Sequence, residues 1–283
     1  MAVPDVSVII TTRNEENNIV ACLESARKQT YPSEKIESIV VDNNSSDRTK
    51  DLAKKYTDKV YNFGPERSAQ RNFGVRQASG KYILYLDADM ILSESIISEA
   101  VQKCEKESCT ALYIPERIIG EGFWIKVRDF ERGFYTATCI DAVRFVRKDK
   151  FQEIGGFDET LTGPEDWDFD RRIRAVGQTG IIKSGLYHNE DNFNLRKYAR
   201  KKLYYTWDFD RYACKWGGND RIIKKQMGMG YRYFGVFLEN GKAGRLFGHP
   251  LLTLGMYFLR IWVGLAYVLN PGHGVKKDEI IRI

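Results

Sequence analysis

This 283-residue chain has few cysteines and no low-complexity tract, and we expect it to have no secretory leader. Its five cysteines form no Cys-x-x-Cys pair, and Met1-Ala-Val-Pro runs directly into a strand-like segment, so we expect a reducing, cytosolic environment. Their thiols are expected to be buried or incidental. The absence of repeats and biased segments excludes extended disorder away from the termini. The five positions are Cys22, Cys104, Cys109, Cys139 and Cys214.

The composition is that of an ordinary folded protein, with 43% hydrophobic and 29% charged residues. Its length allows one large α/β domain with an appendage, or two small domains. We expect a catalytic domain over residues 1–195 and a helical, membrane-associating extension over residues 196–283.

Positive charge is concentrated in the predicted extension. The whole chain has a net charge of +6, whereas residues 196–246 alone hold 13 Lys or Arg and 4 Asp or Glu, interleaved with aromatic residues. Such a segment suits an anionic membrane surface or single-stranded nucleic acid. The apolar stretch Pro250–Leu269 follows it and favours the membrane, with no nucleic acid.

The apolar stretch Pro250–Leu269 is only marginally long enough to span a bilayer. Arg260 lies near its centre and makes insertion costly. We therefore favour an interfacial or re-entrant helix, with a helix packed on a soluble domain as the alternative.

Strand and helix patterns alternate through the first 90 residues. Short β-branched or apolar runs precede segments in which apolar residues recur at helical spacing. This order predicts a mainly parallel, doubly wound sheet of the nucleotide-binding type. The expected strands cover residues 6–11, 36–41, 59–63 and 81–87, and the helices begin near residues 19, 46 and 68.

Two carboxylates follow the most apolar of these strands, at Asp87 and Asp89. In parallel α/β sheets, ligands bind at the carboxyl ends of the strands. Two neighbouring carboxylates there are costly unless a divalent cation or a polar ligand shares them. The pattern favours a metal bridge to a phosphate, and a solvated turn is the alternative.

These features together resemble the family 2 glycosyltransferases of the GT-A fold, from about residue 5 to residue 190. Each motif is weak alone, but they occur in the family's order. The matching elements are residues 8–15, Asp42 with the loop that follows it to Thr49, Arg71-Asn72, Leu86-Asp-Ala-Asp89, Gly155-Gly-Phe-Asp158 and Pro164-Glu-Asp-Trp-Asp168.

The resemblance implies a donor site for a nucleoside-diphosphate sugar. Thr11, Arg13 and Glu15 would border the nucleotide, and Asp42 would bind the base or the ribose. Arg71 would lie beside the diphosphate. A turn cap at Asp42 and a surface salt bridge at Arg71 are the ordinary alternatives.

The resemblance also implies a metal site and a base. Asp89 would bind Mn²⁺ or Mg²⁺ directly, with Asp87 nearer the ribose and His188 as a further metal or phosphate ligand. Asp166, with Glu165 beside it, would be the acceptor-side base. One metal motif and one distant base predict inversion at the anomeric carbon. The alternatives are a structural histidine and an acidic helix face balanced by arginines.

Two departures from the family pattern bear on function. The Gln-x-x-Arg-Trp motif of the processive synthases is missing, which favours an enzyme that adds a single sugar. Asn43 follows Asp42 where many relatives have a second acidic residue. We expect transfer from a UDP- or GDP-sugar to a hydroxyl of a lipid-linked glycan acceptor, in cell-surface polysaccharide or glycoconjugate synthesis, by a peripheral or monotopic enzyme on the cytoplasmic face.

Three other functions compete with this one. A polyprenyl-phosphate sugar synthase has an ionised acceptor that needs no base, so Asp166 would be dispensable. A nucleotidyltransferase would show a glycine-rich loop after the first strand, and residues 11–15 contain no glycine. A non-catalytic, membrane-associated binding protein would have little need for the buried acidic groups.

Overall fold

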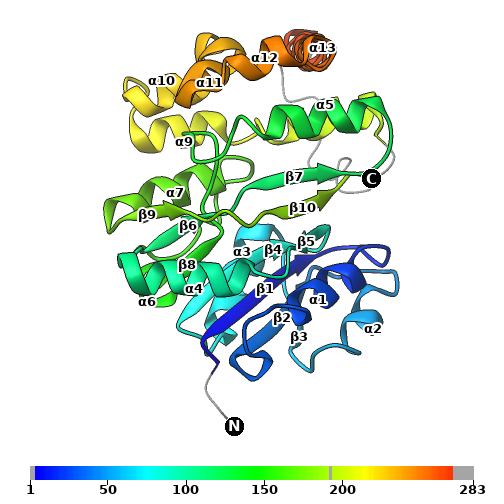
Figure 1. Ribbon diagram of the computed structural model, residues 1–283, viewed down its shortest axis with the longest axis vertical. Coiled ribbons are helices and arrows are strands. Elements are labelled where there is room, and N and C mark those ends of the chain that lie inside the picture. The colour runs from blue at the N-terminus through cyan, green and yellow to red at the C-terminus, as the bar shows by residue number, and fades with distance from the viewer. Residues whose placement is uncertain (1–3, 191–192, 270–283) are drawn as a thin grey trace. The chain divides into compact units, whose positions relative to one another are not determined.

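The computed structural model describes residues 4–190 and 193–269 and divides into two compact units (Figure 1). The predicted boundary at residue 195 lies near the start of the last segment of the second unit, but this unit also includes earlier parts of the chain. The first unit comprises Met1–Arg117, Asp141–Glu159 and Glu165–Asn189, and the second comprises Ile118–Ile140, Thr160–Pro164 and Glu190–Ile283.

A seven-stranded sheet organises the first unit, in the order β3-β2-β1-β4-β8-β6-β9. The pairs β1–β2, β2–β3, β1–β4 and β6–β9 are parallel, whereas β8 runs antiparallel to β4 and β6. This confirms the predicted mixed, mainly parallel sheet. The strands are β1 (Val6–Thr12), β2 (Ile36–Asp42), β3 (Val60–Asn62), β4 (Tyr82–Asp87), β6 (Ala111–Tyr113), β8 (Phe145–Arg147) and β9 (Thr179–Ile181).

Helices alternate with these strands, as the apolar periodicity predicts. The four expected strands of the N-terminal part and the three helices between them are all present. The helices of the first unit are α1 (Ile19–Arg27), α2 (Thr49–Ala53), α3 (Arg67–Gln77), α4 (Ile96–Glu107), α6 (Lys148–Glu153) and α7 (Glu165–Ala175), and a 3₁₀ turn covers Ser33–Lys35.

The central strand β1 is buried on both faces. Its residues Val8 and Ile10 belong to a core that includes α1 and α4. Ile9 points to the other face, where α3 approaches so closely that a Cβ on Gly74 would lie 2.3 Å from the Ile9 side chain. Helices therefore cover both faces of the sheet, and ligands reach it only at its edges.

A second, three-stranded sheet begins directly after Asp89. It contains β5 (Met90–Leu92), β10 (Leu186–Asn189) and β7 (Glu116–Ile119), in the order β5-β10-β7. β10 runs antiparallel to β5 and pairs His188 with Met90. This pairing brings the residue after Asp89 beside His188, although the two are far apart in the sequence.

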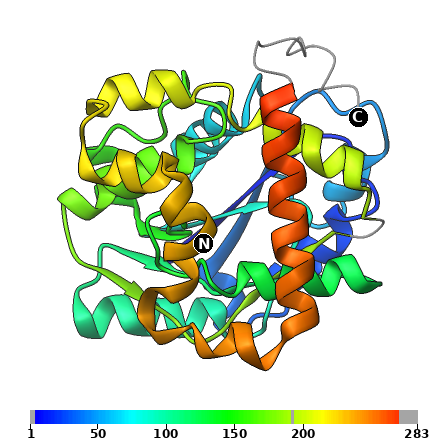
Figure 2. The same ribbon diagram turned by 90° about the horizontal axis from the view of Figure 1, so that it is seen from above.

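In the residues that the structure describes, the second unit is mainly helical. Figure 2 shows α13 crossing α5, and α13 also packs on α8. Its core contains Val127, Phe134, Phe237, Met256 and Leu259. The helices are α5 (Phe123–Arg132), α8 (Leu195–Tyr204), α9 (Phe209–Trp216), α10 (Arg221–Met227), α11 (Val236–Leu238), α12 (Gly244–Gly248) and α13 (Pro250–Leu269), with a π-helical turn at Tyr231–Gly235 and a 3₁₀ turn at Glu239–Gly241.

The two sides of α13 differ in exposure. Gly255, Met256 and Leu259 are buried, and Arg260 forms an ion pair with Glu131 of α5 at 2.9 Å. The other side presents an apolar stripe at helical spacing to solvent. Among the described helices, α13 is long and apolar enough to cross a membrane by length and composition. The stripe consists of Leu251, Leu254, Phe258, Ile261, Trp262 and Leu265.

Candidate active site

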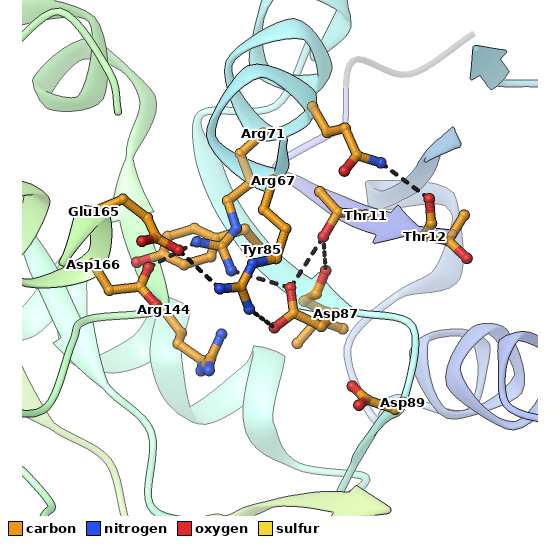
Figure 3. A network of polar contacts seen from close by, with 12 residues as sticks. Thr11, Thr12, Arg67, Arg71, Tyr85, Asp87, Asp89, Arg144, Glu165 and Asp166 are labelled. Carbon is orange, nitrogen blue, oxygen red and sulfur yellow. Dashed lines mark hydrogen bonds and ion pairs between the residues drawn. The ribbon is translucent and has the colours of Figure 1, made fainter. Parts of the chain in front are cut away.

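The parallel strands β1, β2 and β4 end at one edge of the sheet. The register pairs Thr12 with Asp42 and Thr11 with Asp87, so side chains predicted for the donor site meet at this edge. The Thr11 hydroxyl donates a hydrogen bond to the Asp87 carboxylate at 3.0 Å, as Figure 3 shows. The structure thus brings Thr11 and Asp87 together, as the sequence predicts.

Asp42 is fully buried, and its carboxylate holds the loop that follows β2. It accepts hydrogen bonds from the Ser45 backbone N–H, at 2.8 Å, and from the Ser45 hydroxyl. Asp42 therefore makes the contacts of a turn-capping residue, which is the alternative given above. Its contact with a base or ribose stays a prediction. Glu15 is held by Asn18 and Thr49, while the Arg13 side chain is exposed beside it.

Arg71 connects the two predicted halves of the site. Its guanidinium is 1% exposed and donates to Asp166 at 2.7 Å and to Asp87 at 3.1 Å (Figure 3). The rings of Tyr85 and Phe157 lie 4.9 and 5.0 Å from it. Arg71 therefore binds Asp87, a predicted metal-site carboxylate, and Asp166, the predicted base, at the same time.

Arg67 forms a second bridge one helical turn earlier on α3. It lies 2.9 Å from Glu165 and 3.6 Å from Asp87. Burial alone would raise the pKa of Asp87, but Arg71 and Arg67 outweigh it and hold that pKa well below its usual range. Asp87 is therefore ionised at neutral pH.

Glu165 and Asp166 form the first turn of α7. Burial raises the pKa of Glu165 despite the opposing charge of Arg67. Its Oε2 atom is buried and has no hydrogen-bond partner among the described residues. Asp166 is the more exposed of the two carboxylates, with a quarter of its side chain accessible, and it is the better placed to receive a proton from a ligand.

Asp89 lies between β4 and β5 and contacts His188. The His188 Nε2 atom is 2.9 Å from Asp89, and its Nδ1 atom is 3.2 Å from Glu116 at the start of β7. Burial alone would lower the pKa of His188, but the two carboxylates raise it to about 10. Both ring nitrogens then donate, so His188 could bind a metal only after losing a proton.

The donor set at this edge fits a hard divalent cation. One Asp89 oxygen is buried and lacks a hydrogen-bond partner among the described residues, which makes it an available ligand. Within the described ranges, no three His, Cys, Asp or Glu side chains converge into a complete metal site. Mg²⁺ characteristically uses one or two carboxylates and completes its shell with substrate phosphates and water.

Three residues of this network were not predicted from the sequence. Arg67 could have been found, because it lies four positions before Arg71 on the same face of a helix. Glu116 and Arg144, which lie 3.4 Å apart, come from segments without a motif. Only the strand pairing of β5, β10 and β7 brings Glu116 to His188.

Comparison with known families identifies the chain. Residues 7–158, more than half of the chain, match Glycosyl transferase family 2. The chain belongs to this family. The match includes β1, β2, α3 and β4, which supply Thr11, Asp42, Arg71 and Asp87 to the edge described above.

Two curated proteins are similar to parts of this chain. Glycosyltransferase AglE of Haloferax volcanii is 42% identical over 93 residues, covering 30% of this chain and 31% of AglE. Beta-monoglucosyldiacylglycerol synthase of Trichormus variabilis is 24% identical over 254 residues, covering 80% of this chain and 53% of the synthase. The chain thus spans about half or less of these relatives.

Solved structures show the same fold. The mannosyltransferase PcManGT of Pyrobaculum calidifontis, in complex with GDP-Man and Mn²⁺, has a TM-score of 0.64 at 20% identity, covering 94% of this chain and 86% of PcManGT. S. aureus TarS 1–349 with UDP-GlcNAc has a TM-score of 0.56 at 18% identity, covering 93% and 89%. The predicted family and GT-A fold are confirmed.

Proposed function

We propose that this chain is an inverting glycosyltransferase that moves a sugar from a UDP- or GDP-sugar to a hydroxyl group. One observation carries the proposal: the carboxylate Asp87 and the carboxylate Asp166 face each other across the buried guanidinium of Arg71. A donor-side group and an acceptor-side group are thereby held at fixed positions around one site.

The donor would bind at the carboxyl edge of β1, β2 and β4, where Thr11 and Asp87 meet. Asp89 would hold Mn²⁺ or Mg²⁺, and the bound metal would neutralise the charge that develops on the departing diphosphate. Glu116, through His188, would fix the Asp89 carboxylate. The PcManGT complex contains GDP-Man and Mn²⁺, which supports a metal-dependent donor site.

Asp166 would act as the general base on the acceptor side. Its carboxylate lies at the N-terminus of α7, and Arg71 fixes its orientation. Deprotonation of the acceptor hydroxyl by such a group typically contributes 10²- to 10⁴-fold to the rate. Attack from the side opposite the leaving diphosphate inverts the anomeric carbon.

The acceptor is proposed to be a lipid-linked glycan at the cytoplasmic face of a membrane. Of 17 exposed large apolar side chains in the described structure, 15 belong to the second unit. The stripe on α13 suits insertion to headgroup depth. Because Arg260 and the buried side of α13 are engaged with the second unit, we favour an interfacial helix over a spanning one.

One contact favours a second candidate, a polyprenyl-phosphate sugar synthase. The guanidinium of Arg71 already occupies one Asp166 oxygen, at 2.7 Å, so that oxygen is not open to an acceptor hydroxyl. A lipid phosphate is already ionised and requires no base. This candidate therefore predicts normal turnover after Asp166→Asn, whereas the hydroxyl-acceptor proposal predicts a large loss.

A transfer assay tests the proposal directly. The full chain is incubated with UDP- and GDP-sugars, Mn²⁺ and prenyl-linked saccharide or prenyl phosphate acceptors, and release of nucleoside diphosphate is measured. The product's anomeric configuration is read by proton NMR. Acceptor-dependent release with inversion is expected. Retention of configuration, or no release with any donor, would contradict the proposal.

A further inference from the structure

A group of charged side chains lies together in the second unit, some of them buried and others partly exposed. They come from α5, α8, α13, the π-helical turn and the residue that follows β10. All belong to the second unit, whereas the donor-site residues described above belong to the first. The group consists of Arg128, Glu131, Glu190, Lys202, Arg232 and Arg260.

Two arginines already occupy the two carboxylates of this group. Arg128 binds Glu190 through two hydrogen bonds, at 2.9 and 3.1 Å, and binds Glu131 at 3.0 Å. Arg260 binds the other oxygen of Glu131 at 2.9 Å, and the Tyr135 hydroxyl donates to it at 2.7 Å. Both carboxylates, Glu131 and Glu190, are thus already paired with arginines.

Lys202 is a cation of this group that takes part in none of these ion pairs. Within the described ranges its ammonium makes no hydrogen bond or ion pair, and it lies 5.5 Å from the Tyr198 ring centroid. Arg128 contacts the same ring, at 4.9 Å, so a second positive charge lies close by. Burial, followed by the charge of Arg128, lowers the pKa of Lys202 to about 7.

An unpaired ammonium in such surroundings is unfavourable, and a bound anion would relieve it. The side chains of Lys202 and Arg232 are only partly buried, so a ligand can reach both from solvent. A phosphoryl group fits best among common anions, because it has up to two negative charges and three acceptor oxygens for the three ammonium donors and a guanidinium.

We propose that Lys202, with Arg232 and Arg128 around it, forms a binding site for a phosphoryl group. The group comes from an anionic lipid head group or from soluble phosphate. The same cluster contains Arg260, which belongs to the helix with the exposed apolar stripe. This link favours the lipid source. The site is independent of the proposed transfer reaction, since its binding is measured without a nucleotide sugar.

The test compares Lys202→Met with the matched control Lys197→Met. Both lysines belong to α8, and the Lys197 side chain is exposed, so the control makes the same substitution on the same helix outside the charged group. Thermal unfolding of the full chain is followed with inorganic phosphate, with dioctanoyl phosphatidic acid, and with sodium chloride at equal ionic strength. Phosphorus NMR titration gives the affinities.

In the absence of ligand, Lys202→Met is expected to be at least as stable as the wild type, because no ion pair is lost. A phosphoryl ligand should raise the unfolding midpoint of the wild type and of Lys197→Met. Lys202→Met should bind it about tenfold more weakly or not at all, as expected for loss of a charge-assisted contact. Binding of both ligands identifies the phosphoryl group as sufficient, and binding of the phosphatidate alone identifies a lipid site.

Three results would overturn the proposal. The wild type could bind neither ligand, Lys202→Met could bind as tightly as the control, or the unliganded Lys202→Met protein could be clearly less stable than the wild type. The last result would show that Lys202 is a structural partner in the folded unit. Each of them leaves the donor site of the first unit untouched, so failure here is distinguishable from failure of the proposed transferase function.

Discussion

Replacing Arg71 with methionine removes the buried guanidinium that joins Asp87 to Asp166. Methionine keeps much of the aliphatic volume between Tyr85 and Phe157, so the change acts mainly on charge. Removing one partner of a buried ion pair costs about 3–5 kcal/mol, because it leaves an uncompensated charge behind. Asp87 and Asp166 are partly exposed and recover some hydration, which places the expected loss near 3 kcal/mol.

The pH dependence of this loss follows from Asp87. Burial would raise its pKa, but Arg71 and Arg67 hold it well below the usual value. A group with a lowered folded-state pKa stabilises the fold fully above its unfolded pKa of about 3.9, and this stabilisation decreases as the pH falls below that value. In Arg71→Met, burial is opposed less and the Asp87 pKa rises, so the stability difference between wild type and variant should be largest at neutral pH and smaller near pH 3, where Asp87 of the variant is protonated.

Urea unfolding followed by circular dichroism measures this difference without any substrate. Arg76→Met is the matched control, because Arg76 is exposed on the same helix and forms no ion pair in the described structure. The guanidinium of Arg76 lies over the Phe63 and Phe73 rings, so the control should change stability by no more than about 1 kcal/mol. An Arg71→Met protein as stable as Arg76→Met would refute the interpretation of Arg71 as the charge that compensates Asp87 and Asp166.

Three further predictions concern the metal site, the base and the membrane face. Glu116→Gln, which removes the carboxylate that orients His188, should weaken Mn²⁺ binding measured by calorimetry about 10- to 100-fold. Asp166→Asn should lower kcat about 10²-fold or more with donor affinity nearly unchanged, and wild-type turnover would favour the lipid-phosphate acceptor. Leu254→Glu with Phe258→Glu should reduce co-sedimentation with anionic liposomes, and undiminished binding would contradict the interfacial role of α13.

The sequence was sufficient to predict the N-terminal parallel strands of the first unit and the residues at their ends. Strands β1, β2 and β4 are buried on both faces, so they appear as continuous apolar runs that end in polar residues. The residues at those ends, Thr11, Asp42 and Asp87, could be placed at one edge because parallel strands end together. The GT-A resemblance then supplied an interpretation of each side chain.

The remaining contacts depend on pairings that no local pattern encodes. Helix α5 contains the charged residues Arg128 and Glu131 on its buried side, where they pair with each other and with residues of other segments, and no local pattern indicates those partners. From the sequence, Arg260 was interpreted as a charge that makes membrane insertion costly. In the structure it forms an ion pair with Glu131. Glu116 reaches His188 only through the order of the small sheet.

Calorimetric titration of UDP- and GDP-sugars into the wild type and Asp89→Ala, each with and without Mn²⁺, tests the central claim most directly. We expect one nucleotide class to bind the wild type with Mn²⁺ present. Asp89→Ala should lose this metal-dependent binding, because it lacks the carboxylate oxygen available to the cation. Undiminished, metal-dependent donor affinity in Asp89→Ala would contradict the metal assignment. No binding of either nucleotide class to the wild type would contradict the donor site itself.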